Sequence, residues 1–80
     1  MRIIMADGRV LEGTAVQIVE TMRSIAFLPS GTSLSDYIRT TVAQARSFMG
    51  VELDVPDGDE EFMAAALVRE MVKAGLERRG

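Results

Sequence analysis

Six carboxylates cluster in the second half of the chain and are the residues best suited to bind a metal ion: Glu52, Asp54, Asp57, Asp59, Glu60 and Glu61. Calcium and magnesium prefer carboxylate oxygens held on a glycine-containing loop. With Gly58 at the sixth position of an EF-hand loop, however, Leu53 and Val55 occupy positions that require oxygen ligands. The cluster fits better with the exposed face of a strand followed by the start of a helix, where acidic residues are favourable. We therefore predict no metal site.

A second pattern has the glycine spacing of a phosphate-binding loop, from Gly8 to Gly13 and Thr14. In that loop a lysine follows the second glycine and binds the phosphates. Thr14 stands in its place, and Glu12 would bring a negative charge against a phosphate. We interpret Gly8 as a turn residue and Gly13 as the end of a strand, and we predict no cofactor.

The composition removes the side chains on which most enzymes rely. The chain has no cysteine and no histidine, so it lacks the usual thiol nucleophile and the commonest general base. The single lysine, Lys73, falls near the end of a predicted helix, where a positive charge complements the helix dipole. Asp57 and Glu60 would need a cleft to act as an acid–base pair, and so small a domain offers little cleft. We predict no catalytic residue and no enzymatic activity.

Chain length and net charge limit the classes of protein to which the chain could belong. Residues 1–80 are expected to form one domain, because 48% hydrophobic and 26% charged residues are a globular balance. The net charge of −3 argues against broad binding to nucleic acid or to anionic membranes. No apolar run approaches the ~20 residues of a membrane span, and Asp7 interrupts the N-terminal run before it could form a signal peptide. We expect a cytoplasmic protein, and its preference for arginine over lysine would suit a GC-rich bacterial genome.

Residues 2–13 are predicted to form a β-hairpin around Asp7-Gly8, a favoured two-residue turn. This turn places Ile4 opposite Leu11 on one face. The other face then carries Ile3, Met5 and Val10. Both faces are apolar and only one can cover the helices, so the face with Ile4 and Leu11 needs another partner.

Two helices are expected next, over residues 14–28 and 33–49, because each segment has one apolar stripe at helical spacing. The first helix is expected to end at Phe27-Leu28. Each helix begins at a pair with capping-box spacing, Thr14 with Gln17 and Ser33 with Asp36.

Residues 51–55 alternate between apolar and acidic side chains, which predicts a third strand beside the hairpin. A helix over residues 59–76 follows, with Asp57 and Glu60 at capping-box spacing and Gly75 as a left-handed C-terminal cap. This helix is apolar over most of its circumference, which is typical of a buried helix.

These elements predict a small α+β domain of order ββααβα, with an N-terminal β-hairpin and a third short strand packed by three helices. The alternative is a mainly α-helical bundle with a β-ribbon.

Residues 33–39, Ser-Leu-Ser-Asp-Tyr-Ile-Arg, resemble the start of the second helix of ribbon-helix-helix repressors. The order strand, helix, loop, helix over residues 9–49 is also similar to that family. The resemblance implies a DNA-binding regulator or antitoxin, in which the ribbon of a dimer enters the major groove. Arg2 and Arg9 would supply its basic groups, but they share their predicted face with Ile4 and Leu11, and the chain is acidic overall.

Our leading hypothesis is a small non-catalytic protein–protein interaction domain that self-associates. A chain of this length buries only about 60% of its unfolded surface, and such chains often complete their core by oligomerising. We expect a homodimer, and an unidentified protein partner is also compatible with the pattern. The predicted interface residues are Ile4, Leu11, Phe27 and Leu28. A ribbon-helix-helix-like DNA-binding regulator is the alternative.

Overall fold

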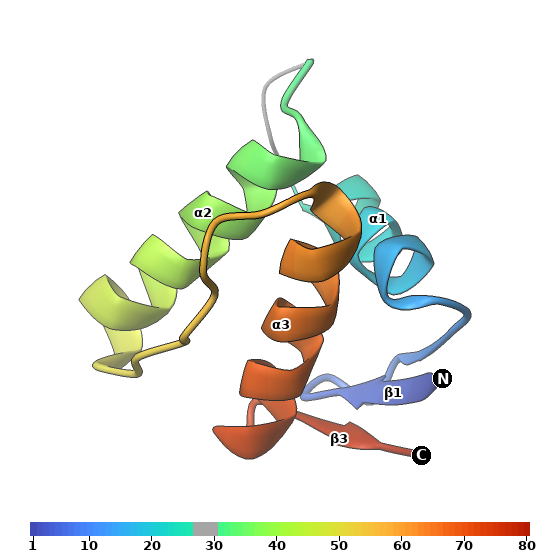
Figure 1. Cartoon of the computed structure of the whole chain (residues 1–80). Helices are drawn as coiled ribbons and strands as arrows, with labels where there is room; N and C mark the ends of the chain where they lie inside the picture. Colours follow the sequence, from blue (N-terminus) through green and yellow to red (C-terminus); the bar gives the residue numbers. More distant parts are fainter. Residues whose placement is uncertain (27–30) are drawn as a thin grey trace.

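The structure, a computed structural model, describes residues 1–26 and 31–80 and has a sheet covered on one side by helices (Figure 1). In chain order the elements are β1 (Arg2–Met5), β2 (Val10–Glu12), α1 (Ala15–Ile25), α2 (Leu34–Gln44), the π-helical turn η1 (Ala45–Met49), α3 (Glu60–Lys73) and β3 (Glu77–Arg79). The strand order in the antiparallel sheet is β2-β1-β3. The predicted small α+β fold is confirmed.

The hairpin register differs by one residue from the prediction. Ile3 pairs with Leu11, and Ile4 pairs with Val10. The loop has three residues rather than two, because the amide of Met5 donates to the carbonyl of Arg9 at 2.8 Å. Gly8 takes the left-handed conformation, with φ of +91°, that such a loop requires at its last position. A one-residue shift moves each side chain of the second strand to the opposite face, so Ile4 and Leu11 do not share a face.

The core lies between the helix-covered face of the sheet and the helices. α1 packs on β2, α3 packs on β3, and α2 packs on both of these helices. Ile4 and Val10 are paired and lie on the other face of the sheet. None of the described helices covers that face (Figure 1). The largest fully buried side chains are Ile3, Ile18, Val19, Ile38, Met63, Leu67 and Val68.

The third strand lies at the C-terminus and not at residues 51–55, where it was predicted. The alternation there did predict burial, because Leu53 is buried while Glu52 and Asp54 are exposed. The segment has no strand neighbour, however. The amide of Asp54 instead donates to Oε1 of Glu70 at 3.0 Å. The free edge of β1 is occupied by β3, with Ile4 opposite Arg78.

The helix starts follow local capping chemistry. Thr14 and Gln17 form the predicted capping box, and the Ser33 hydroxyl accepts the amide hydrogen of Asp36. The cap of α3 is Asp59 and not Asp57, because the Asp59 carboxylate accepts the amide hydrogen of Phe62 at 2.8 Å. The predicted end of the first helix, at Phe27-Leu28, lies outside the described residues.

Gly75 ends α3 with the left-handed cap that the sequence predicted, and the chain then continues into β3, which the sequence did not predict. Its φ is +80°, and the amides of Gly75 and Leu76 donate to the carbonyls of Val72 and Met71 at 3.1 and 2.9 Å. This pair of bonds is the Schellman motif, which ends a helix and reverses the chain. It therefore places β3 where it can pair with β1.

The corrected register predicts unequal costs for two truncations in β2. Leu11→Ala should lower the free energy of unfolding by about 2–4 kcal/mol, because Leu11 is only 8% exposed. Val10→Ala should cost less than about 1 kcal/mol, because Val10 is 45% exposed. Urea denaturation of the two variants measures the difference. Equal costs, or a larger cost at Val10, would contradict the register.

Candidate functional site

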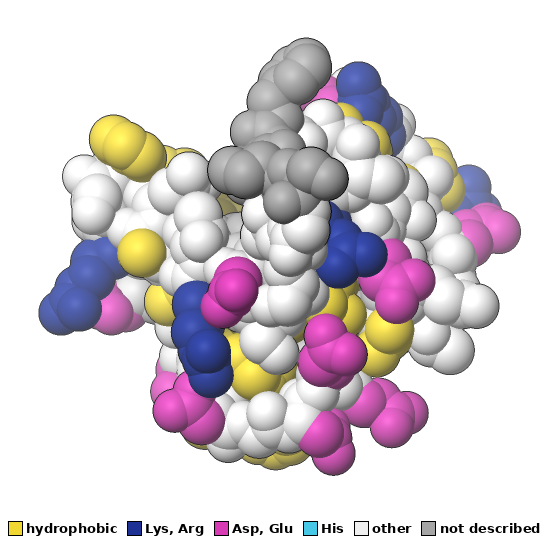
Figure 2. Space-filling view, turned by 90° about the horizontal axis from the view of Figure 1, so that it is seen from above, with side chains coloured by type: hydrophobic (Ala, Val, Ile, Leu, Met, Phe, Trp, Pro, Cys, Tyr) yellow, Lys and Arg dark blue, Asp and Glu magenta, His cyan; other side chains and the backbone are white. Residues whose placement is uncertain are grey.

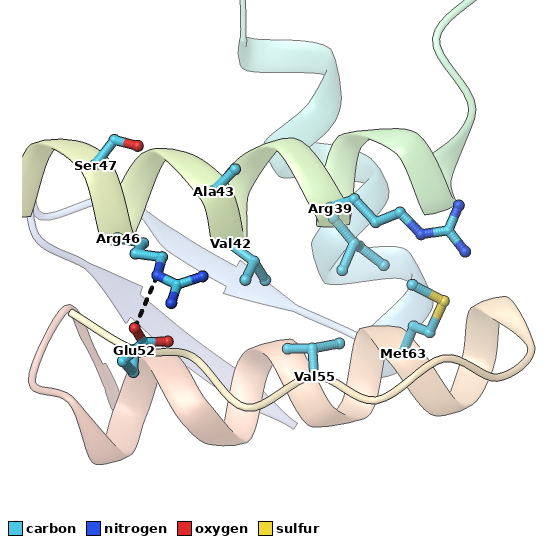
Figure 3. A pocket seen from close by; sticks show the side chains of 9 residues that line it. Arg39, Val42, Ala43, Arg46, Ser47, Glu52, Val55 and Met63 are labelled. Atoms are coloured by element: carbon cyan, nitrogen blue, oxygen red, sulfur yellow. Dashed lines mark ion pairs between the residues drawn. The ribbon is translucent and has the colours of Figure 1, made fainter. Parts of the chain in front are cut away.

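A groove of about 270 Å³ runs between the α2–η1 helix and the segment of residues 51–57 (Figure 3). Val42 and Val55 face each other across it, and Met63 of α3 also lines it. Its polar lining residues are Arg39, Arg46, Ser47 and Glu52.

Both arginines of this groove are paired within the chain. Nε of Arg46 lies 3.0 Å from Oε1 of Glu52, and Nη2 of Arg39 donates to Oδ1 of Asp57 at 3.2 Å. Exposed ion pairs of this kind contribute at most about 1 kcal/mol each. They nevertheless fasten residues 51–57 to the helix at two points. We interpret the groove as a packing contact that positions residues 51–57, because both of its arginines are neutralised by acidic residues of that segment.

A second surface lies on the outer side of α2. We call it the α2 stripe, and its residues line a shallow hollow of about 340 Å³: Thr40, Ala43, Gln44, Ser47 and Phe48. Spacings of three and four residues place these side chains on one side of a helix. The stripe carries no charge. Phe48 at its end is 82% exposed, more than any other large hydrophobic residue in the described part of the chain.

Helical spacing places Phe48 on the apolar stripe of residues 33–49, so its exposure in the structure is unexpected. The helix changes from α to π geometry at Ala45, which is the last buried residue of the stretch. Hydrogen bonds in a π-helix span five residues instead of four, so each turn holds more residues. The residues beyond Ala45 are therefore rotated away from the buried stripe of α2.

A third surface is a hollow of about 300 Å³, formed where the hairpin turn, the end of η1 and the turn between α3 and β3 meet. We call it the methionine hollow, and its lining residues are Met5, Ala6, Asp7, Met49, Met71, Leu76 and Glu77. A smaller hollow of about 190 Å³ shares four of these residues and adds Arg78. Mostly apolar walls with a few polar groups are typical of a small-ligand site.

Glu77 is the unusual group of the methionine hollow. Its side chain is 4% exposed, and within residues 1–26 and 31–80 neither carboxylate oxygen has a hydrogen-bond partner. Burial raises the pKa of Glu77 above its ordinary value of 4.5. Strand geometry explains the placement, because Glu77 lies opposite Met5 on the helix-covered face while the next residue, Arg78, points to the open face. An unpaired buried charge destabilises a fold, and such groups concentrate at functional sites.

The other buried carboxylate of the described chain, Glu70, differs in this respect. Its Oε1 accepts the Asp54 amide at 3.0 Å, and its Oε2 lies 3.7 Å from Nε of Arg69. Glu70 therefore has a structural role, because it holds the backbone of the extended segment. Glu77 has no comparable role.

The structure describes two of the four predicted interface residues, and it places Ile4 and Leu11 on opposite faces of the sheet. Ile4 is half-buried on the uncovered face of the sheet, beside Val10. Leu11 belongs to the core, so its predicted place on the same exposed face was wrong. Phe27 and Leu28 lie outside the described residues. Whether Ile4 contacts another chain stays a prediction.

The charged groups are spread over the surface. Arg2 and Arg9, the basic residues of the DNA-binding alternative, lie 3.5 Å from Glu12 and 3.2 Å from Asp7. Figure 2 shows acidic and basic side chains interspersed on the helical side, with small hydrophobic areas between them. In the described ranges, no group of three or more acidic side chains could hold a metal ion. No helix described here is long and apolar enough to cross a membrane.

Phe48 and Glu77 were both missed as site residues from the sequence. The aromatic ring fitted a continuous helical stripe, and only the change of helix geometry exposes it. Glu77 fell after a predicted helix end in the polar run Glu-Arg-Arg, which has no strand signal. The glycine at position 75 was the one available sign that the chain turns back there.

Comparison with known proteins adds no further identification. No protein-family model matches the chain, and no curated protein or solved structure shows significant similarity to it.

The unpaired carboxylate predicts a pH-dependent stability difference. The raised pKa of Glu77 means that its protonated form stabilises the fold below the unfolded pKa, and that this contribution is lost as the pH rises through the folded pKa. Glu77→Gln should therefore raise the melting temperature at pH 7. The gain is roughly 4–8 °C if the buried charge costs ~1 kcal/mol.

This gain should shrink toward zero below about pH 4, where the wild-type carboxyl is protonated in both states. Thermal unfolding of both proteins from pH 3 to pH 8 measures it. The matched control is Glu70→Gln, which should show no gain at pH 7 because its carboxylate already accepts a backbone hydrogen bond. An equal gain in both variants would contradict the role assigned to Glu77.

Proposed function

We propose that the protein is a non-catalytic interaction domain that forms a homodimer through the α2 stripe. The observation that carries this proposal is Phe48, an aromatic side chain that is 82% exposed beside a hollow on its own helix. Burying a large apolar side chain contributes about 1.5–3 kcal/mol. A surface aromatic ring of this kind is typical of the centre of an interface.

A second copy of the chain is the occupant that fits this surface. The stripe holds both a protruding ring and a hollow, and a two-fold axis brings each ring to the partner's hollow. If the axis passes near Gln44 and the two helices run antiparallel, Phe48 of one copy lies across Thr40 of the other. Small side chains at Ala43 and Ser47 let two helices approach to their usual 8–10 Å separation.

Charge also favours self-association at this surface. Each chain carries a net charge of −3, so most surfaces of two copies would bring like charges together. The α2 stripe has no charged residue. The neighbouring Arg39 and Arg46 are neutralised by Asp57 and Glu52 of their own chain. Two stripes therefore meet without repulsion between like charges.

Energetics predict a dimer that dissociates on dilution. Two buried rings contribute about 3–6 kcal/mol together. Association costs at least about 4 kcal/mol of lost translational and rotational freedom. Any further net free energy of association must come from the contacts of the remaining stripe residues. These residues have small or polar side chains, which contribute little, so the dimer is expected to be weak.

Phe48→Ser should therefore shift the protein from dimer to monomer. Light scattering after size exclusion, over a range of concentrations, should show a wild-type mass that rises toward twice the 8.7 kDa of one chain. The variant should stay near 8.7 kDa at the same concentrations. The control is Phe62→Ser at the start of α3, where the ring is 49% exposed and lies outside the stripe. It should self-associate like the wild type.

A further variant separates the α2 stripe from the interface that the sequence predicted. Ile4→Asp places a charge on the open face of the sheet and should leave the dimer intact if the stripe is the contact. If Ile4→Asp is monomeric while Phe48→Ser remains dimeric, the dimer interface lies on the open face of the sheet and not on the α2 stripe. A wild type that stays monomeric at every concentration would reject self-association altogether.

A further inference from the structure

We infer that the methionine hollow binds a small alkylammonium ion, with Glu77 as the anion that receives its charged end. This inference is independent of the proposed dimer, because the α2 stripe and the methionine hollow share no lining residue. Glu77 is buried without a hydrogen-bond partner, and a bound cation would give its carboxylate that partner.

The first reason is the charge of the hollow. Glu77 is 4% exposed as a residue, and its buried carboxylate oxygens have no hydrogen-bond partner in the described chain. The only other charged residue in the lining is Asp7, whose Oδ2 lies 3.2 Å from Nε of Arg9. The smaller adjoining hollow adds Arg78, but this residue alternates with Glu77 along β3 and so points to the open face. Among the described residues, the lining of the hollow thus holds an anion that is not matched by a cation.

The second reason is the position of the hollow between two helix ends. Met49 is the last residue of the α2–η1 helix, and Met71 stands in the last turn of α3. Both helices therefore direct their C-terminal ends, which carry partial negative charge, toward this part of the molecule. A positive group is favoured there by the two dipoles as well as by the carboxylate.

The third reason is the chemistry of the walls. Three methionines and Leu76 line the hollow together with Glu77. Methionine is flexible and polarizable, so it adapts to an apolar ligand. A volume of about 300 Å³ admits a short alkyl chain but not a large ring system. The ligand class that meets all three conditions is a primary amine, protonated, with an unbranched alkyl tail of a few carbons.

The test uses the full chain with ¹³C-labelled methionine methyl groups and n-hexylammonium chloride as the probe. Saturable shifts are expected for the methyl groups of Met5, Met49 and Met71. Met22 and Met63 are buried elsewhere in the core and should not move. Hexanol and ammonium chloride, titrated separately, should each bind at least 10-fold more weakly, because each lacks one half of the recognition.

Two variants test the role of the charge. Glu77→Gln should weaken hexylammonium binding at least 10-fold, while Glu70→Gln should leave it unchanged. Met49→Lys places a cation of the chain's own at the rim of the hollow and should abolish binding of the probe. The signals of Met22 and Met63 report in each case whether the core is intact.

Three outcomes would overturn the inference. One is the absence of any saturable shift in the wild type. Another is equal affinity for hexanol and hexylammonium, which would mean that the hollow binds only an alkyl chain. The third is equal loss of affinity in Glu77→Gln and Glu70→Gln, which would mean that the effect is one of net charge and not of the site.

Discussion

The antiparallel pairing of β3 with β1 joins the two ends of the chain, and most of the structure depends on it. A hairpin of β1 and β2 alone would be marginal in water. The third strand makes β1 the central strand, with Ile3 fully buried beneath the helices. The backbone amide of Gly80 still donates to the carbonyl of Arg2 at 3.0 Å, so the pairing extends to the last residue. This closure fixes α3 over the sheet, because only one tight turn separates α3 from β3.

The same closure produces the most unusual group in the molecule. The turn at Gly75 sets the register of β3, and that register directs the side chain of Glu77 under the helices. An apolar residue at this position would pack against Met5 without a desolvation cost. A sequence that keeps a carboxylate there gives up stability, and positions that break a local rule without a structural return are candidates for function. The proposal of a cation site follows from this physical imbalance.

The α2 helix contributes in a different way. One side of it packs on α1 and α3, and ion pairs from Arg39 and Arg46 hold residues 51–57 along its edge. Its outer side carries the α2 stripe, and the π-helical turn at its end exposes Phe48 there. The two surfaces for which we propose functions therefore meet near the end of this helix. Phe48 belongs to the α2 stripe, and the neighbouring Met49 belongs to the methionine hollow.

The sequence by itself determined the features that depend on neighbouring residues. The cap at Thr14, the cap at Ser33 and the left-handed turn at Gly75 were all predicted, because each involves hydrogen bonds across three to five residues. The burial of Leu53 was predicted from the alternation of apolar and acidic side chains over residues 51–55, which is also a pattern among neighbouring residues. The small α+β class followed from the sum of these local signals.

Only the tertiary structure decided which strands pair and what those pairings bury. Alternation at residues 51–55 reports which side chains are buried but not which backbone accepts the hydrogen bonds, and here Glu70 takes the place of a strand. One extra residue in the hairpin loop, Ala6, shifts the register and places Leu11 in the core. The polar run of β3 became a strand because β1 had a free edge. Strand pairing and register are set by contacts between residues distant in sequence, so the burial of Glu77 was fixed by the fold and not by its neighbours.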